Sequence, residues 1–126
     1  MTVSGLLNRK VINFVLDSRI LAVPQAKEVI VGRFAPTDSI QPDLDLGPFG
    51  AAERGVSRRH AKITYKDGET WIIDLSSMNG TWLNGEALEP IRAYPLHDGD
   101  KLRLGKLELL VKFGSTAFIH SRDGKK

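Results

Sequence analysis

Residues 60–75 read HAKITYKDGETWIIDL, two short apolar runs on either side of Lys66-Asp67-Gly68. Asp-Gly between two such runs is a strong hairpin signal, because both residues tolerate the positive φ angles of a tight turn. The second run, residues 70–75, is β-branched and aromatic and too short for a stable helix. The segment therefore predicts a β-hairpin.

Short apolar runs and turn signals continue along the rest of the chain, and no long segment has clean helical periodicity. Asn79-Gly80 and Asn84-Gly85 leave only residues 81–83 between them, so we expect only the second to be a simple hairpin turn. The predicted strands are 11–16, 19–23, 28–31, 44–46, 60–65, 70–75, 81–83, 100–104 and 107–113. Short strands at roughly ten-residue spacing predict an all-β domain, an antiparallel β-sandwich.

The longest break between predicted strands runs from residue 34 to residue 56 and holds Pro36, Pro42 and Pro48. Only Leu44-Asp45-Leu46 within it has the composition of a strand. Loops of this length in a compact domain are usually functional or disordered. We therefore expect this segment to be either functional or disordered.

The composition restricts the class of protein. A chain of 126 residues suits one domain, and 18 basic against 15 acidic residues is too small an excess to identify a nucleic-acid binder. No apolar run is long enough to span a membrane, and residues 1–10 lack the charged-then-apolar order of a signal peptide. The absence of cysteine excludes disulfides and thiolate sites and fits a reducing compartment, so we expect a cytoplasmic protein.

Three clusters of polar residues lie where predicted strands meet loops: residues 31–33, 56–61 and 74–85. They contain guanidinium groups, hydroxyls and an amide, without an obvious base or metal cage. Arginine presents a planar fork that matches phosphate oxygens, and serine and glycine-rich turns add further donors. Such a set suits a phosphate dianion that is bound without being transformed.

The order of these motifs resembles that of the forkhead-associated (FHA) family, whose members bind phosphothreonine peptides. The matching motifs are Gly32-Arg33, Ser57-Arg58-Arg59-His60, Ser77-Met78-Asn79-Gly80-Thr81, Asn84-Gly85 and residues 96–102. The resemblance implies an SMAD/FHA-like β-sandwich of about 10–11 strands. It assigns residues 1–113 to the FHA domain and leaves residues 114–126 as a polar, basic tail or linker.

The resemblance also implies a role for each matching residue. Arg33 and Ser57 would bind the phosphate, and Arg58 would add a second charged contact. Asn79 would hold the peptide backbone beside the phosphothreonine. The residues expected to shape the loops are Gly32, His60, Gly80 and Thr81.

Two further positions bear on specificity. Gly55 lies in the loop that, in the family, helps to read the residue three after the phosphothreonine. Met78 stands where the family often has threonine or serine, so a hydroxyl contact to the phosphate is lost unless Ser77 or a backbone N–H replaces it.

The function implied is that of a non-catalytic adaptor in kinase signalling. Its partner would be a protein that carries phosphothreonine, either a Ser/Thr kinase or a kinase substrate. We expect no cofactor, no bound metal, no nucleic acid and no membrane. The segment His97-Asp98-Gly99-Asp100 has atoms that could bind a metal, but its Asp-Gly pair is more typical of a turn.

Three alternatives belong to other classes. The lack of a hydroxyl at Met78 favours a degenerate FHA domain that binds a partner, or itself, without phosphate. A hydrolase could use Ser57, His60 and Asp74, although no Gly-x-Ser-x-Gly elbow is present. Nucleic-acid binding would use the arginines of residues 54–59 and would depend steeply on salt.

Overall fold

The computed structural model describes residues 10–115. Within this range the chain forms eleven β-strands and one 3₁₀ turn, η1 (Gly47–Phe49), and no α-helix. The strands are β1 (Lys10–Leu16), β2 (Arg19–Pro24), β3 (Glu28–Gly32), β4 (Leu44–Asp45), β5 (Arg59–Lys66), β6 (Glu69–Asp74), β7 (Thr81–Leu83), β8 (Glu86–Ala87), β9 (Ala93–Pro95), β10 (Lys101–Leu104) and β11 (Leu107–Ser115).

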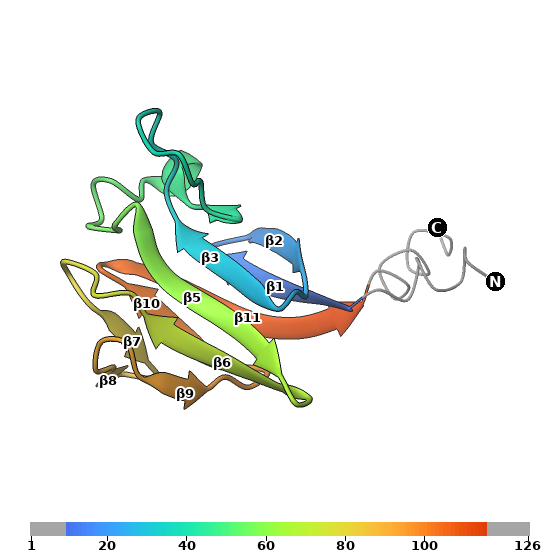
Figure 1. The fold of residues 1–126 in the computed structure, drawn as a ribbon. Coiled ribbons are helices and arrows are strands. Elements are labelled where there is room, and N and C mark those ends of the chain that lie inside the picture. Colours follow the sequence, from blue (N-terminus) through green and yellow to red (C-terminus); the bar gives the residue numbers. More distant parts are fainter. Residues whose placement is uncertain (1–9, 116–126) are drawn as a thin grey trace, which may run out of the picture.

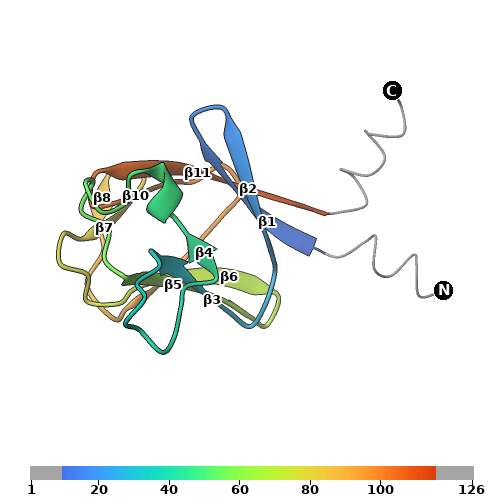
Figure 2. The same ribbon diagram turned by 90° about the horizontal axis from the view of Figure 1, so that it is seen from above.

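The strands form two sheets that face each other as a sandwich (Figure 2). One sheet has the order β2-β1-β11-β10-β7-β8 and the other has the order β4-β3-β5-β6-β9. Neighbouring strands are antiparallel except for β3 and β4, which run parallel. The predicted all-β sandwich is therefore confirmed, with one parallel pair at the edge of the second sheet.

The hairpin predicted from residues 60–75 is formed by β5 and β6. Asp67 and Gly68 both have positive φ, at 54° and 79°, as a tight turn of matching twist requires. Alternate residues of β6, Thr70, Ile72 and Asp74, are buried between the sheets. This period of two in burial is that of a strand with one face toward the core.

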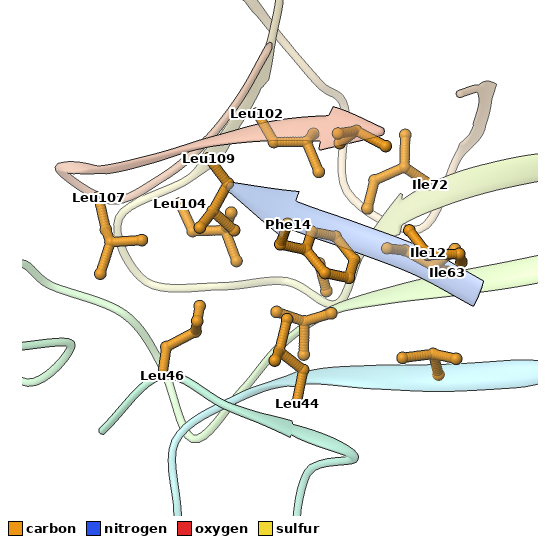
Figure 3. Packing of buried hydrophobic residues seen from close by; sticks show 14 of the residues in the cluster. Ile12, Phe14, Leu44, Leu46, Ile63, Ile72, Leu102, Leu104, Leu107 and Leu109 are labelled. Carbon is orange, nitrogen blue, oxygen red and sulfur yellow. The ribbon is translucent and has the colours of Figure 1, made fainter. Parts of the chain in front are cut away.

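The core fills the space between the sheets (Figure 3). Phe14 of β1 has no exposed surface and lies near the centre, with Leu102 and Leu109 from the same sheet. Ile63 and Ile72 approach from the opposite sheet. Removing this apolar surface from water, at roughly 25 cal/mol per Å², provides the main driving force for packing the sheets together.

Two strands were missed from the sequence. The two-residue β8 is exposed, and β9 ends at Pro95 at the edge of its sheet, so neither has a run of alternating apolar residues. Asn84 and Gly85 form the turn between β7 and β8 with φ of 51° and 88°, which confirms the second Asn-Gly as the hairpin turn.

The strand expected within the break between residues 34 and 56 is present, and a 3₁₀ turn that was not expected follows it. The strand is β4 and the turn is η1. Leu46 is fully buried, and its N–H donates to the carbonyl of Gly32 at 2.7 Å. The Asp43 carboxylate also accepts a hydrogen bond from the N–H of Ile30 at 2.8 Å. These contacts hold the segment against β3 and explain the parallel pairing.

Some predictions concern residues outside the described range. The expected absence of a signal peptide falls on residues 1–9, and most of the expected tail falls on residues 116–126. Gly114 and Ser115, the first residues of that tail, belong to β11. Between residues 10 and 115, no helix has the length and apolar character needed to cross a membrane.

The predicted functional segments lie at one end of the sandwich (Figure 1). The loop after β3, the segment before β5, the loop after β6 and the β10–β11 turn all lie there. The start of β1 and the end of β11 are at the opposite end. Segments far apart in the sequence therefore converge on one surface.

Candidate functional site

Arg33 lies beside the segment that contains Ser57. Its backbone N–H donates to the carbonyl of Arg58 at 3.1 Å, and its side-chain Nε donates to the carbonyl of Val56 at 2.7 Å. The two contacts bracket Ser57 and orient the guanidinium. The terminal nitrogens of Arg33 have no hydrogen-bond partner within residues 10–115, so they can serve a ligand.

Gly32 makes this close approach possible. The register between β3 and β5 shifts at Val31/Gly32. A Cβ atom on Gly32 would lie 1.9 Å from the carbonyl oxygen of Arg58. Any side chain here would push the strand end away from the segment before β5.

His60 supports the site from the interior of the protein. The ring is fully buried, with Nδ1 accepting from the N–H of Ser57 at 2.9 Å and Nε2 lying 2.9 Å from the carbonyl of Gly80. A carbonyl can only accept, so the hydrogen bonds assign the proton to Nε2. One neutral imidazole thus joins the loop before β5 to the loop after β6.

Burial lowers the pKa of His60 below its ordinary value of 6.5. The hydrogen bond to Gly80 and the charge of Asp74 oppose this effect but do not reverse it. The neutral ring is also the form that the N–H of Ser57 requires, because a protonated Nδ1 would place two donors face to face.

The Ser57 hydroxyl connects the same two loops. Its Oγ accepts a hydrogen bond from the N–H of Met78 at 3.2 Å. A hydroxyl that accepts still has its own proton to donate. The proton of Ser57 is therefore available to an acceptor beside Arg33.

Asp74 organises the loop after β6, a role that the sequence reasoning missed. The carboxylate is only 2% exposed. Its Oδ1 accepts from the hydroxyls of Ser77 and Thr81, both at 2.6 Å, and its Oδ2 accepts from the N–H of Ser77 at 3.2 Å. The sequence did contain a signal for this role. Asp74 ends a predicted strand, and residues with hydroxyls follow it three and seven positions later, at Ser77 and Thr81.

Ser77 cannot take the place of the hydroxyl that Met78 lacks. Its Oγ donates to Asp74 and accepts from the N–H of Gly80 at 3.0 Å. The Met78 side chain is 88% exposed, while its backbone N–H faces Ser57. An apolar side chain therefore stands at the rim of the site.

Asn79 also connects the loop after β6 to the loop before β5. Its Nδ2 donates to the carbonyl of Gly55 at 2.9 Å. Gly55 has φ of 80°, and a Cβ atom there would lie 2.7 Å from the same Nδ2. A side chain at position 55 would therefore displace the Asn79 amide. The Asn79 side chain is exposed on the surface of the loop.

Arg58 is paired within the protein. Its guanidinium donates to Asp38 at 2.9 Å, and the two side chains are 49% and 28% exposed. A surface pair of this kind is worth about 0–1 kcal/mol. Asp38, which the sequence reasoning did not single out, thus holds the arginine that follows Ser57.

The hydrolase alternative has no geometric support. Both ring nitrogens of His60 face backbone groups, and Ser57 Oγ faces the N–H of Met78. Asp74 binds hydroxyls of its own loop.

Within the described part of the chain, no group of three His, Asp or Glu side chains could hold a metal ion.

Comparison with protein families agrees with this arrangement of loops. Residues 29–105 match the sequence profile of the FHA domain. The chain belongs to the FHA domain family. An FHA domain from Arabidopsis thaliana superposes with a TM-score of 0.66 and 29% identity over 87% of this chain and 89% of that one.

A second FHA domain structure comes from work on phosphothreonine-dependent FHA domain interactions. It is 30% identical, covers 81% of this chain and 95% of its own, and has a TM-score of 0.60. Protein FraH of Nostoc is 37% identical over 75% of this chain. The chain spans only 32% of the length of FraH, so this FHA domain corresponds to one part of that relative.

Proposed function

We propose that this FHA domain binds a phosphothreonine-containing segment of a partner protein and does not modify it. The observation that carries the proposal is the position of Arg33. Its guanidinium is anchored through Nε to the carbonyl of Val56, the residue before Ser57, and within residues 10–115 its terminal N–H groups have no partner. The hydroxyl of Ser57 accepts from Met78 and keeps its own proton to donate. In this proposal both side chains donate to a phosphate monoester, which carries about −1.5 to −2 charges and three acceptor oxygens.

In this proposal the side chain of Asn79 contacts the peptide backbone. The amide has two N–H groups and one carbonyl oxygen, and the bond to Gly55 uses one N–H. The remaining groups can pair with a peptide that crosses the loops. Each hydrogen bond to a charged group contributes about 1.5–3 kcal/mol, so phosphate and backbone contacts together offset much of the association cost.

The similar FHA domain studied for phosphothreonine-dependent interactions supports this class of ligand. In this proposal a Ser/Thr kinase creates the ligand, on itself or on a substrate, and the FHA domain tethers the modified protein. Such a partner suits an intracellular setting, with which a chain without cysteine is compatible.

Met78 favours one competing function. An exposed methionine at the rim of the site provides apolar contact area and no hydroxyl for a phosphate. A phosphate-independent interaction, with a partner or with a second copy, would use this side chain. The two functions differ in whether the phosphate is required.

The deciding experiment is a titration with an oriented phosphothreonine peptide library, followed by matched phosphothreonine, phosphoserine and threonine versions of the best sequence. We expect the phosphothreonine version to bind and the threonine version to lose most of the affinity. Arg33→Ala should abolish binding, and Arg33→Lys should restore only part of it because the fork geometry is lost. Lys66→Ala, at the far hairpin, removes the same charge and should have no effect.

Equal binding of the phosphorylated and bare peptides would overturn the proposal. Were Met78→Ala to weaken both peptides equally while Arg33→Ala had no effect, the phosphate-independent function would hold instead.

A further inference from the structure

The strands at the edges of the two sheets differ in length. Within residues 10–115 the sheets end at β4, β8 and β9, which have two, two and three residues, and at β2, which has six. Short edge strands limit pairing with other chains, because an edge carries unpaired N–H and C=O groups. The longer edge at β2, which lies on the rim of the molecule (Figure 2), is therefore the best suited of the four to accept a further strand.

The hydrogen-bond register of β1 and β2 identifies the free backbone groups. The N–H of Gln25 donates to the carbonyl of Lys10 at 2.9 Å, so these two residues form a hydrogen-bonded pair. Bonded and non-bonded pairs alternate along an antiparallel ladder, so Ile20, Ala22 and Pro24 direct their backbone groups away from β1. β2 pairs only with β1, and no turn or loop hydrogen bond within residues 10–115 uses the N–H of Ile20 or Ala22.

The side chains of this edge do not protect it from pairing. Residues 20–24 carry no charge, Ile20 is 63% exposed, and Ala22 is also exposed. Arg19 begins the strand, but its guanidinium lies over the ring of Phe49, 5.2 Å from the ring centre. Edge strands are usually protected by charged side chains or proline. Here Pro24 protects only the last position of the strand.

The free groups of β2 match those of a second β2 that runs antiparallel to it. When Ile20 lies opposite Ala22 of the second copy, the free N–H and carbonyl of each residue face those of the other. The pairing also places a large side chain beside a small one on the same face of the sheet. The two Arg19 residues then lie at opposite ends of the ladder. The edge is therefore complementary to itself, as a two-fold symmetric interface requires.

We propose that two copies of this chain associate through β2, antiparallel and with Ile20 opposite Ala22, so that their six-stranded sheets become continuous. The ladder is short and buries less than the roughly 1,200 Å² of a standard interface. We expect a weak dimer, with a dissociation constant on the order of 0.1 mM. β2 contributes no residue to the candidate site, so this inference does not rest on the proposed function, and the dimer presents two such sites.

Sedimentation velocity of the full chain without peptide, at concentrations on either side of that constant, tests the association. The average mass should rise with concentration from that of one chain toward that of two. Ile20→Lys adds a charge to the edge and should raise the dissociation constant at least about tenfold. Ala22→Pro should have a similar effect, because it removes an N–H that faces away from β1.

Ile91→Lys is the matched control for the first substitution. Ile91 is 64% exposed and lies between β8 and β9, away from β2. This variant should dimerise as the wild type does. Circular dichroism of all three variants confirms that each is folded before its mass is interpreted.

Cross-linking tests the register, because the chain has no cysteine of its own. Ile20→Cys and Ala22→Cys are oxidised separately and as a mixture. Opposed residues of a bonded pair have Cα atoms about 5.5 Å apart, which a disulfide can span. In the proposed register the mixture should give a cross-linked product of the two variants. Neither variant should cross-link with itself, because its two thiols would be two residues out of register.

Three outcomes would overturn the inference. The first is a mass that stays at one chain at every concentration. The second is a dimer that Ile20→Lys and Ala22→Pro leave unchanged, or that Ile91→Lys weakens equally. The third is cross-linking of either variant with itself and not in the mixture. Ile20→Lys should still bind the best phosphothreonine peptide as the wild type does, so failure of the dimer and failure of the proposed function are separate results.

Discussion

At the scale of single residues, the site consists of polar groups that satisfy one another and leave a few donors free. His60 uses both ring nitrogens on backbone groups, and Asp74 accepts from two hydroxyls and an N–H. The groups left free within residues 10–115 include the terminal nitrogens of Arg33, the proton of Ser57 and part of the Asn79 amide. Because the supporting residues are already paired, the free donors are held in place before a ligand arrives.

The stability of the protein should fall as the pH drops below about 6.5, because His60 must remain neutral when folded. Burial lowers its pKa in the folded state, so the unfolded chain binds more protons between the lowered pKa and 6.5. Stability therefore rises with pH through this window and is fully present above it. Urea unfolding of the wild type and of His60→Gln across this range measures the effect. An identical pH dependence of the two proteins would contradict it.

Asp38→Asn should strengthen the binding of the best phosphothreonine peptide. In the proposed complex, the carboxylate of Asp38 would compete with the phosphate for Arg58 and repel it. A surface pair of this kind is worth about 0–1 kcal/mol, so the gain should not exceed about fivefold. Titration of Asp38→Asn, Arg58→Ala and the double variant checks this, and a gain that persists without Arg58 would refute the mechanism.

At the scale of elements, the loop after β6 is organised around one buried side chain. It carries Met78 and Asn79, and it is attached at its two ends to one buried carboxylate, that of Asp74. The loop before β5 has no such centre and is held from outside, by His60 and Asn79. The conformation of one loop therefore depends on the other.

Asp74→Asn should lower the free energy of unfolding by at least about 1.5–3 kcal/mol, the value of a hydrogen bond to a charged group. The same substitution should also weaken the proposed phosphothreonine binding, since the N–H of Met78 and the side chain of Asn79 would shift with the loop. Denaturant unfolding and peptide titration measure the two effects. The matched pair Thr81→Ser and Thr81→Val is the control: serine keeps the hydroxyl for Asp74, and valine removes it at constant shape. Equal stability of that pair would show that the hydroxyl contact is unimportant.

At the scale of the whole molecule, one core connects the binding end of the sandwich to its other end. Phe14 on β1 and Leu46 beside η1 belong to the same buried cluster. The loops are thus attached to two sheets that cannot shift separately without opening the core. The domain should unfold as one cooperative unit.

Phe14→Ala should lower the free energy of unfolding by about 3–5 kcal/mol, because the sheets close only partly around the cavity. Ile20→Ala is the matched control: its side chain is 63% exposed, and the cost of a surface change stays near about 0.5 kcal/mol. Urea unfolding followed by circular dichroism and by tryptophan fluorescence gives both values. Similar costs for the two variants would contradict the central position of Phe14.

Local chemistry made much of the fold predictable. The hairpin of β5 and β6 and the Asn84-Gly85 turn depend on neighbouring residues, whose turn preferences and alternation are visible in the sequence. The short edge strands β8 and β9 were missed, because their pairing depends on the sheets that they join. The family motifs likewise predicted which loops form the candidate site, and these loops lie together at one end of the sandwich.

Only the tertiary structure decided which groups meet. The hydroxyl of Ser57 meets the N–H of Met78, and the ring of His60 meets the carbonyl of Gly80. The backbone carbonyl of Arg54 meets the N–H of Lys106, again across a long stretch of chain. Such contacts depend on how two sheets stack and where their loops converge, and no local preference encodes that. The sequence by itself determined an all-β chain with phosphate-binding residue types at its strand ends. The packing of the sheets pairs the hydroxyl of Ser77 with Asp74 and the guanidinium of Arg58 with Asp38. Within residues 10–115 it leaves the terminal nitrogens of Arg33 and the proton of Ser57 without a partner.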